Sequence, residues 1–206
     1  MNIILSFENF ILKVKRYLYK RYNKMLFDSP NITIGKNFIV HNKIYLRMNK
    51  NSRLTIGNNF LYNSGDFFNP IARNIRGGFF LNDNSQVFIG NNVGISCTCI
   101  WSNLFIKIGD RVKIGADTII MDTDAHSLNY LERRNDETDG IKAKNKPIII
   151  EDDVLIGTRC IILKGVHIGA RSIIGSGSIV TKDIPSDSIA AGNPCKVLKK
   201  IDNDKQ

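Results

Sequence analysis

One histidine in this chain stands beside acidic residues in a pattern that suits base chemistry. His126 closes the stretch DTDAH at 122–126, which contains Asp122 and Asp124. An imidazole can take the proton of an attacking hydroxyl near neutral pH. A nearby carboxylate could orient the ring or bind hydroxyl groups of an acceptor, and exposed loop acids are the alternative interpretation. We predict His126 as a general base, with Asp122 or Asp124 supporting it. His41 and His167 lack such a setting, and we interpret both as structural.

A six-residue repeat must position this histidine. Every sixth residue after Ile150 is aliphatic, namely Ile150, Ile156, Ile162, Ile168, Ile174 and Val180. A small or compact residue follows four positions after each of the first five, namely Val154, Cys160, Val166, Ser172 and Ser178. This period fits neither a helix nor an alternating strand. It predicts a chain coiled as a triangular prism, with six residues to a side and eighteen to a turn.

The residue types follow from that geometry. The aliphatic side chains point inward and stack on their copies in the next coil, at a sheet spacing of about 4.8 Å. The small residues fill inward positions near the corners. Glycine directly follows the aliphatic residue at Gly157, Gly169 and Gly175. We expect these glycines at corners that require a positive φ angle.

Earlier segments repeat the same phrase and reveal where the chain leaves the prism. ITIGKN at 32–37, LTIGNN at 54–59, VFIGNN at 87–92 and IKIGDR at 106–111 open successive coils, and later coils open at Ile150 and Ile168. The spacings between these six openers are 22, 33, 19, 42 and 18 residues. The largest excess predicts a protruding loop at about 124–147, which begins beside His126. Parallel crossovers are normally right-handed, so the handedness of the prism does not follow from the period.

The hexads resemble those of the hexapeptide-repeat acyltransferases. The resemblance is strongest to the galactoside/maltose O-acetyltransferases and the bacterial surface-polysaccharide O-acetyltransferases. It is dense from about residue 85 to 201 and most specific in IIGSGSIVTKDIPSDSIAAGNPCKVLKKI. It implies an all-β fold, a left-handed parallel β-helix, and assembly as a homotrimer with active sites between subunits. It also implies direct acetyl transfer from acetyl-CoA to a sugar hydroxyl, with His126 as the general base and without a metal ion.

The resemblance also assigns binding residues. Ser96 matches an acceptor-binding position that is asparagine in the galactoside enzymes, and ISCTCI at 95–100 is closer to the surface-glycan enzymes. The positions implied to bind acetyl-CoA are Gly157, Thr158, Ser176, Thr181, Lys182, Lys196 and Lys199. Leu155 replaces a tryptophan that is frequent in the family.

Charge and segment composition bound the remaining possibilities. The net charge of +10 calls for an anionic partner, but the basic residues form no nucleic-acid module, so we expect no nucleic-acid partner. Residues 1–27 predict a basic amphipathic helix, which could lie on an anionic membrane or pack on the main domain or another subunit. A β-helix domain at 28–185 and a closing segment at 186–206 complete the expected organisation. The four cysteines are expected to be free thiols in a cytoplasmic protein, which could be peripheral at the inner face of the membrane.

Several rival functions stay open. An N-acetyltransferase of an amino sugar or nucleotide-amino sugar needs the same donor and base. A streptogramin-type drug acetyltransferase or a serine acetyltransferase shares the repeat, and a non-catalytic scaffold needs no chemistry at all. A carbonic anhydrase on the same prism is disfavoured, because it requires three histidines around zinc and only His126 lies in the right region.

Overall fold

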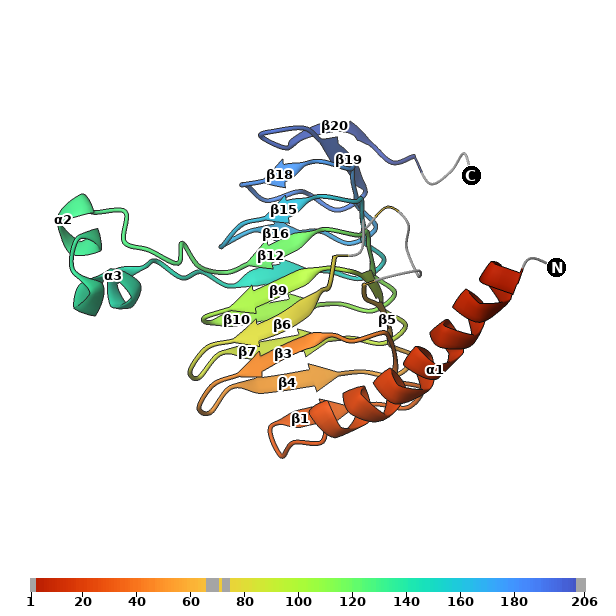
Figure 1. Cartoon of the computed structure of the whole chain (residues 1–206). Coiled ribbons are helices and arrows are strands. Elements are labelled where there is room, and N and C mark those ends of the chain that lie inside the picture. The colour runs from red at the N-terminus through yellow and green to blue at the C-terminus, as the bar shows by residue number, and fades with distance from the viewer. Residues whose placement is uncertain (1–2, 66–70, 72–74, 203–206) are drawn as a thin grey trace.

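Three sheets form the sides of a triangular prism in the computed structural model, which describes residues 3–65, 71 and 75–202 (Figure 1). Sheet A contains β1 (Ile32–Ile34), β4 (Arg53–Ile56), β7 (Gln86–Ile89), β10 (Phe105–Ile108), β13 (Ile148–Ile150) and β16 (His167–Ile168). Sheet B contains β2 (Ile39–His41), β5 (Leu61–Asn63), β8 (Gly94–Ser96), β11 (Lys113–Ile114), β14 (Leu155–Ile156), β17 (Ile173–Ile174), β19 (Ser188–Ala191) and β20 (Lys196–Lys200). Sheet C contains β3 (Tyr45–Met48), β6 (Gly78–Leu81), β9 (Cys99–Ser102), β12 (Ile119–Met121), β15 (Ile161–Ile162) and β18 (Ile179–Val180).

Successive coils align in the register that the repeat predicts. Ile150 pairs with Ile168 in sheet A, and Ile156 pairs with Ile174 in sheet B. The inward aliphatic residues and the small residues four positions later are buried. The predicted fold class is therefore confirmed: an all-β, left-handed parallel β-helix with an N-terminal helix and a protruding loop.

The glycines that directly follow the inward aliphatic residues do not provide the positive φ angles expected of them. Gly157, Gly169 and Gly175 do not have positive φ angles; the left-handed residue comes two positions after Gly157, at Arg159, with a φ of 57°. A Cβ atom added to Gly157 would lie 2.5 Å from the backbone nitrogen of Ser176 in the next coil. The prediction of positive φ at these glycines was wrong, because the corner requires them for the close approach of one coil to the next.

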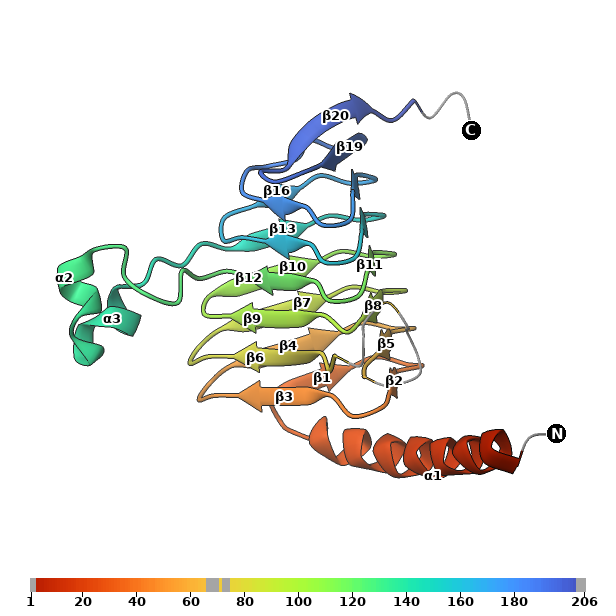
Figure 2. The ribbon, with the colours of Figure 1, turned by 45° about the horizontal axis from the view of Figure 1, so that its top comes forward.

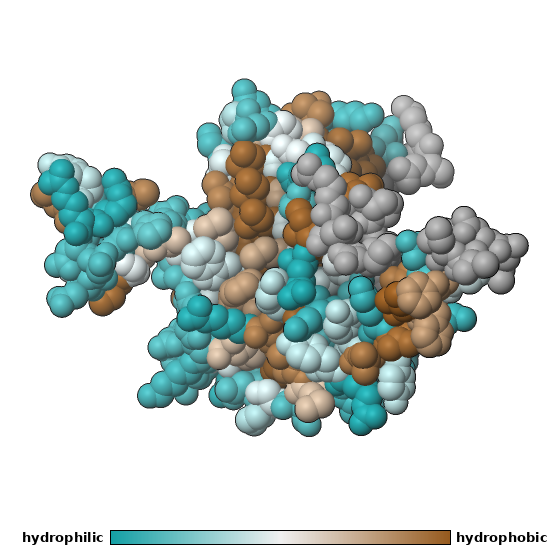
Figure 3. All heavy atoms as spheres, viewed as in Figure 1, coloured by the Kyte–Doolittle hydropathy of each residue, from teal (hydrophilic) through white to brown (hydrophobic). Residues whose placement is uncertain are grey.

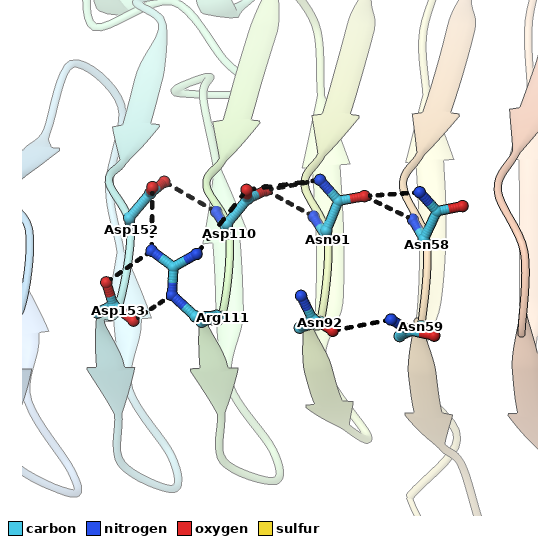
Figure 4. A network of polar contacts seen from close by, with 8 residues as sticks. All are labelled: Asn58, Asn59, Asn91, Asn92, Asp110, Arg111, Asp152 and Asp153. Carbon is cyan, nitrogen blue, oxygen red and sulfur yellow. Dashed lines mark hydrogen bonds and ion pairs between the residues drawn. The ribbon is translucent and has the colours of Figure 1, made fainter.

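A ladder of polar side chains ties the coils together at the corner between sheets A and B (Figure 4). The Oδ1 atom of Asn91 accepts the backbone N–H of Asn58 at 2.9 Å. In the same way, Asp110 accepts the N–H of Asn91 at 2.6 Å, and Asp152 accepts that of Asp110 at 2.9 Å. The ladder satisfies backbone donors that the turn leaves without a strand partner.

Aromatic side chains fill the first coils, where the helix α1 (Ile3–Leu26) closes the end of the prism (Figure 2). Phe27, the residue after α1, is buried, and its ring centroid lies 4.9 Å from that of Phe38. Phe38 in turn stacks on Phe60 at 5.6 Å. The end of α1 thus covers the core of the first coil.

No helix within the described residues is long and apolar enough to span a bilayer.

The chain leaves the prism between β12 and β13 as an arm, a name used below for residues 122–147. Its helices are α2 (Tyr130–Arg133) and α3 (Asp136–Lys142), which stand away from the prism in both views (Figures 1 and 2). Asn129 and Asn135 cap the two helices, because each side chain accepts a backbone N–H two residues later. The division of the chain at residues 27/28 and 185/186 stays a prediction.

Candidate active site

His126 lies on the arm, where Asp139 of α3 contacts its ring. The Nδ1 atom of His126 is 2.5 Å from Oδ2 of Asp139. The other Asp139 oxygen accepts the backbone N–H of Ser127 at 2.8 Å. The His126 side chain is 68% exposed, whereas that of Asp139 is 15% exposed. When Nδ1 donates its hydrogen to the carboxylate, Nε2 is the nitrogen that can accept a proton from a substrate.

The carboxylate of Asp139 is held in its charged form. The hydrogen bond with His126, followed by that from the Ser127 N–H, keeps the pKa of Asp139 below its usual value. A charged carboxylate on Nδ1 stabilises the imidazolium that forms when Nε2 takes up a proton. The pair therefore has the arrangement of a base and the group that orients it.

Asp139 was not predicted from the sequence. It lies 13 positions beyond His126, in the acidic run DETD at 136–139, which is also typical of a solvated surface. The available signal was Asn135, an N-cap residue whose side chain accepts the backbone N–H of Glu137 at 2.9 Å. This cap predicts a short helix, although it does not predict that the helix folds back onto His126.

Asp122, which we expected to support His126, has a structural position instead. Its side chain is fully buried. It accepts hydrogen bonds from the Ser102 hydroxyl at 2.8 Å and from the backbone N–H groups of Asn103 and Phe105 at 2.6 and 2.8 Å. Asp122 therefore holds the turn between β9 and β10, one coil earlier, and does not orient the His126 ring.

Asp124, the other expected partner, anchors the base of the arm. Its Oδ1 atom lies 2.8 Å from Nζ of Lys164, and its backbone N–H donates to the carbonyl of Lys144 at 3.0 Å. Asp124 meets His126 through the backbone, where the His126 N–H donates to the Asp124 carbonyl at 2.7 Å. The structure thus replaces Asp122 and Asp124 by Asp139 as the partner of the ring. A role of either aspartate in acceptor binding stays a prediction.

A groove of about 400 Å³ runs along the outside of sheet B, towards its corner with sheet C. It brings together four of the predicted site residues, Ser96, Gly157, Thr158 and Ser176. The backbone N–H of Thr158 donates to the Ser176 hydroxyl at 3.2 Å. The remaining lining residues are Leu61, Asn63, Gly94, Ile95, Lys113, Ile114, Gly115, Leu155 and Ile156. The groove is therefore a mainly apolar trough with hydroxyl groups and one lysine at its rim.

The other predicted donor-binding residues lie outside this groove. Thr181 and Lys182 follow β18 at the corner between sheets C and A, which is also the corner that bears the arm. Lys196 and Lys199 are exposed on β20, at the end of sheet B. None of the four lines the groove. The predicted set is thus divided between two corners and one end of the prism.

The groove and His126 lie on opposite sides of one chain. Figure 2 shows the arm on one side of the prism and the strands β5, β8 and β11 on the other, and Figure 1 shows β5 on that same side. Within a single chain, therefore, His126 does not line the groove. Two other kinds of reactive group are also accounted for. Within the described residues, no cluster of three His, Cys, Asp or Glu side chains could hold a metal ion. Burial raises the pKa of the Cys160 thiol, so this thiol is protonated at neutral pH.

Comparisons with known proteins place this geometry in context. Residues 147–182 match the family described as the hexapeptide repeat of succinyl-transferase. The chain is 39% identical over 124 residues to the galactoside O-acetyltransferase of Escherichia coli strain K12. This match covers 59% of this chain and 58% of that protein. The chain covers 57% of the length of relatives from Staphylococcus aureus.

Two solved structures are similar to this one over most of the chain. A polySia-specific acetyltransferase is 27% identical, with a TM-score of 0.57, and the match covers 85% of this chain and 86% of that one. A galactoside acetyltransferase in complex with coenzyme A is 25% identical, with a TM-score of 0.50, and covers 94% of this chain and 84% of that one. The predicted resemblance is confirmed: residues 147–182 match the hexapeptide-repeat family, and the chain is similar to galactoside O-acetyltransferases and to other hexapeptide-repeat acetyltransferases.

Proposed function

We propose that this protein is an acetyl-CoA-dependent O-acetyltransferase that acts on a sugar hydroxyl in bacterial surface-glycan biosynthesis. The observation that carries the proposal is the contact of 2.5 Å between His126 and Asp139 on an arm beside a hexapeptide-repeat prism. The similar galactoside enzyme in complex with coenzyme A supports the donor, and the similar polySia-specific enzyme supports a glycan acceptor.

The reaction needs few protein groups. Nε2 of His126 takes the proton of the acceptor hydroxyl while the hydroxyl oxygen attacks the acetyl carbon of the thioester. The bond between this carbon and sulfur then breaks, and the thiolate leaving group takes the proton back from the imidazolium. Asp139 stabilises the imidazolium between these two transfers. The atoms balance without a metal ion or a covalent intermediate on the enzyme.

The groove fits the donor in its shape and chemistry. Coenzyme A has a long, flexible pantetheine arm, which suits a shallow trough with an apolar floor. Gly157 lines the groove at the corner, and Thr158 and Ser176 offer hydroxyl groups beside it. The exposed lysines Lys196 and Lys199 at the end of sheet B could then meet the phosphates of the donor. Roles of Thr181 and Lys182 belong to the same proposal.

We further propose a homotrimer in which His126 of one chain serves the groove of another. The separation of the two within one chain supports this. The outward side chains of sheet C support it too, because they form an apolar stripe, visible in Figure 3, that a neighbouring prism could cover. The stripe consists of Cys99, Ile119, Ile161 and Ile179, which follow one another in the strand register.

An acetyl-CoA thiol-release assay over a panel of acceptors tests the reaction. Free sugars, glycolipids, amino sugars and nucleotide-amino sugars form the panel. The proposal predicts turnover with a hydroxyl acceptor that has no amine. Turnover only with an amino sugar would support the alternative, an N-acetyltransferase. No turnover and no heat of coenzyme A binding in titration calorimetry would indicate a non-catalytic scaffold.

A further inference from the structure

The helix α1 uses one face to dock on the prism. The Asn23 side chain is buried, and its Nδ2 atom donates to the carbonyl oxygens of Val40 and Asn42 at 3.3 and 2.7 Å. Leu26, on the same face one turn later, packs against the hydrophobic core. Toward the N-terminus, α1 extends past the first coil (Figure 2). Docking therefore depends on the last turns of the helix.

A second face of α1 carries large apolar side chains that the prism does not cover. Their exposed fractions are 63% for Phe7, 62% for Phe10, 41% for Val14, 55% for Leu18 and 76% for Met25. With about 100° between successive residues of a helix, Leu18 lies roughly 140° around the axis from the docking residue Asn23. The prediction that the apolar face packs on the main domain is therefore wrong for this face within one chain.

Cations surround this apolar face. The helix carries Lys13, Lys15, Arg16, Lys20, Arg21 and Lys24, against a single acidic residue, Glu8. A second α1 on the same face would bring together two strongly cationic helices, which repel each other. An anionic lipid surface, in contrast, accepts the cations at its headgroups and the aromatic and aliphatic side chains at the boundary with the acyl chains.

We propose that α1 binds the surface of an anionic lipid bilayer, with Phe7, Phe10 and Leu18 inserted below the headgroups. The docked end of α1 then attaches the first coil of the prism to the membrane. This binding site is separate from the groove and from His126, and it does not depend on the proposed acetyl transfer.

Vesicle sedimentation of the full-length protein tests this proposal. The vesicles contain either phosphatidylcholine alone or equal parts of phosphatidylcholine and phosphatidylglycerol. We expect the wild type to bind the anionic vesicles at least about tenfold more tightly than the neutral ones at an ionic strength of ~0.15 M. Combined Phe7→Ala, Phe10→Ala and Leu18→Ala substitutions should weaken binding to the anionic vesicles at least about tenfold. Combined Lys13→Gln, Lys20→Gln and Lys24→Gln substitutions should weaken it by roughly 100-fold.

A matched variant on the arm serves as the control. Leu128, Leu131 and Ile141 are 70%, 59% and 82% exposed, so their combined replacement by alanine removes a similar apolar surface elsewhere. This control should bind vesicles like the wild type, and all variants should unfold near the wild-type temperature. The proposal fails if the wild type stays in the supernatant with anionic vesicles, or if the α1 and arm variants bind equally well. It also fails if light scattering without lipid shows that the alanine variant of α1 loses assembly mass, since a second copy would then cover this face.

Discussion

The groove and the arm solve the problem of positioning side chains in opposite ways. The groove consists of repeat positions: Gly157 and Ser176 occupy equivalent corners of neighbouring coils, and the coil spacing alone brings them together. The arm interrupts the repeat, and its two short helices must fold back before Asp139 reaches His126. A regular scaffold thus presents an extended binding surface, whereas the reactive group comes from the irregular insertion.

Removing the imidazole should have the largest effect. We expect His126→Ala to lower kcat by roughly 10²- to 10⁴-fold, while coenzyme A affinity in titration calorimetry stays near the wild-type value. His167→Ala is the matched control, because His167 is also exposed and also pairs with an acid, Glu151, at 2.8 Å. Turnover that survives in His126→Ala would assign the base to another group.

Asp139→Asn tests the orientation of the ring by the arm. Because the amide cannot stabilise an imidazolium as a carboxylate does, we expect kcat to fall by at least about tenfold, with an unchanged KM for acetyl-CoA. Asp136→Asn removes an acid from the same helix α3 and should leave kcat near the wild-type value. Equal effects of the two substitutions would contradict the role of Asp139.

Two glycine substitutions contrast the stability of the two regions. Gly157→Ala places a Cβ 2.5 Å from the Ser176 nitrogen, and we expect it to lower the free energy of unfolding by about 1–3 kcal/mol. Gly140→Ala in α3 meets no atom within 4 Å and should stabilise that helix by up to about 1 kcal/mol. Thermal unfolding measures both. A harmless Gly157→Ala would show that the coils do not need this close approach.

Ser176→Ala should produce a smaller loss at the groove. Its hydroxyl lines the groove, and one hydrogen bond from it to the bound donor would contribute about 1 kcal/mol, or roughly fivefold. We expect the KM for acetyl-CoA to rise by that factor, with little change in kcat. Thr33→Ala, an exposed hydroxyl position on sheet A, is the control. An equal rise in KM with both variants would show that the effect of Ser176→Ala does not arise in the groove.

Acidification should release the contact between Asp139 and the Ser127 amide on the arm. The folded protein lowers the pKa of Asp139, so the stabilisation from its ionised form is complete above the usual aspartate pKa of about 3.9. It is lost as the pH falls through the lower, folded value. Protection of the Ser127 amide against hydrogen exchange should therefore persist at pH ~5 and decline only below about pH 4. Protection that is already lost near pH ~6 would contradict a lowered pKa of Asp139 in the folded protein.

The repeat made the prism predictable, because its period depends on many residues in the same phase. Positions such as Ser96, Thr158 and Ser176 then follow from the coil spacing once the family resemblance places one of them in a site. The same logic failed for the glycines. A glycine in the sequence shows that a Cβ is excluded at that position, but it does not show whether a close backbone approach or a positive φ angle is the reason.

The arm was less predictable because nothing repeats in it. Proximity along the chain favoured Asp122 and Asp124 as partners of His126, but the strand that ends at Met121 directs Asp122 inward, to the turn of the previous coil. Asp139 depends on a tertiary fold of two short helices, for which one sequence carries only the cap at Asn135. The exposed face of α1 likewise required the structure, because an amphipathic pattern does not identify what covers it.

Subunit mixing tests the central claim, that the base of one chain serves the groove of another. His126→Ala and Ser176→Trp, which fills the groove, should each be nearly inactive alone. Co-expressed in equal amounts, they should regain about a quarter of the wild-type turnover, because random assembly pairs an intact His126 with an intact groove in about one site of four. No recovery in mixed assemblies, verified by differential affinity tags, would contradict a site shared between subunits.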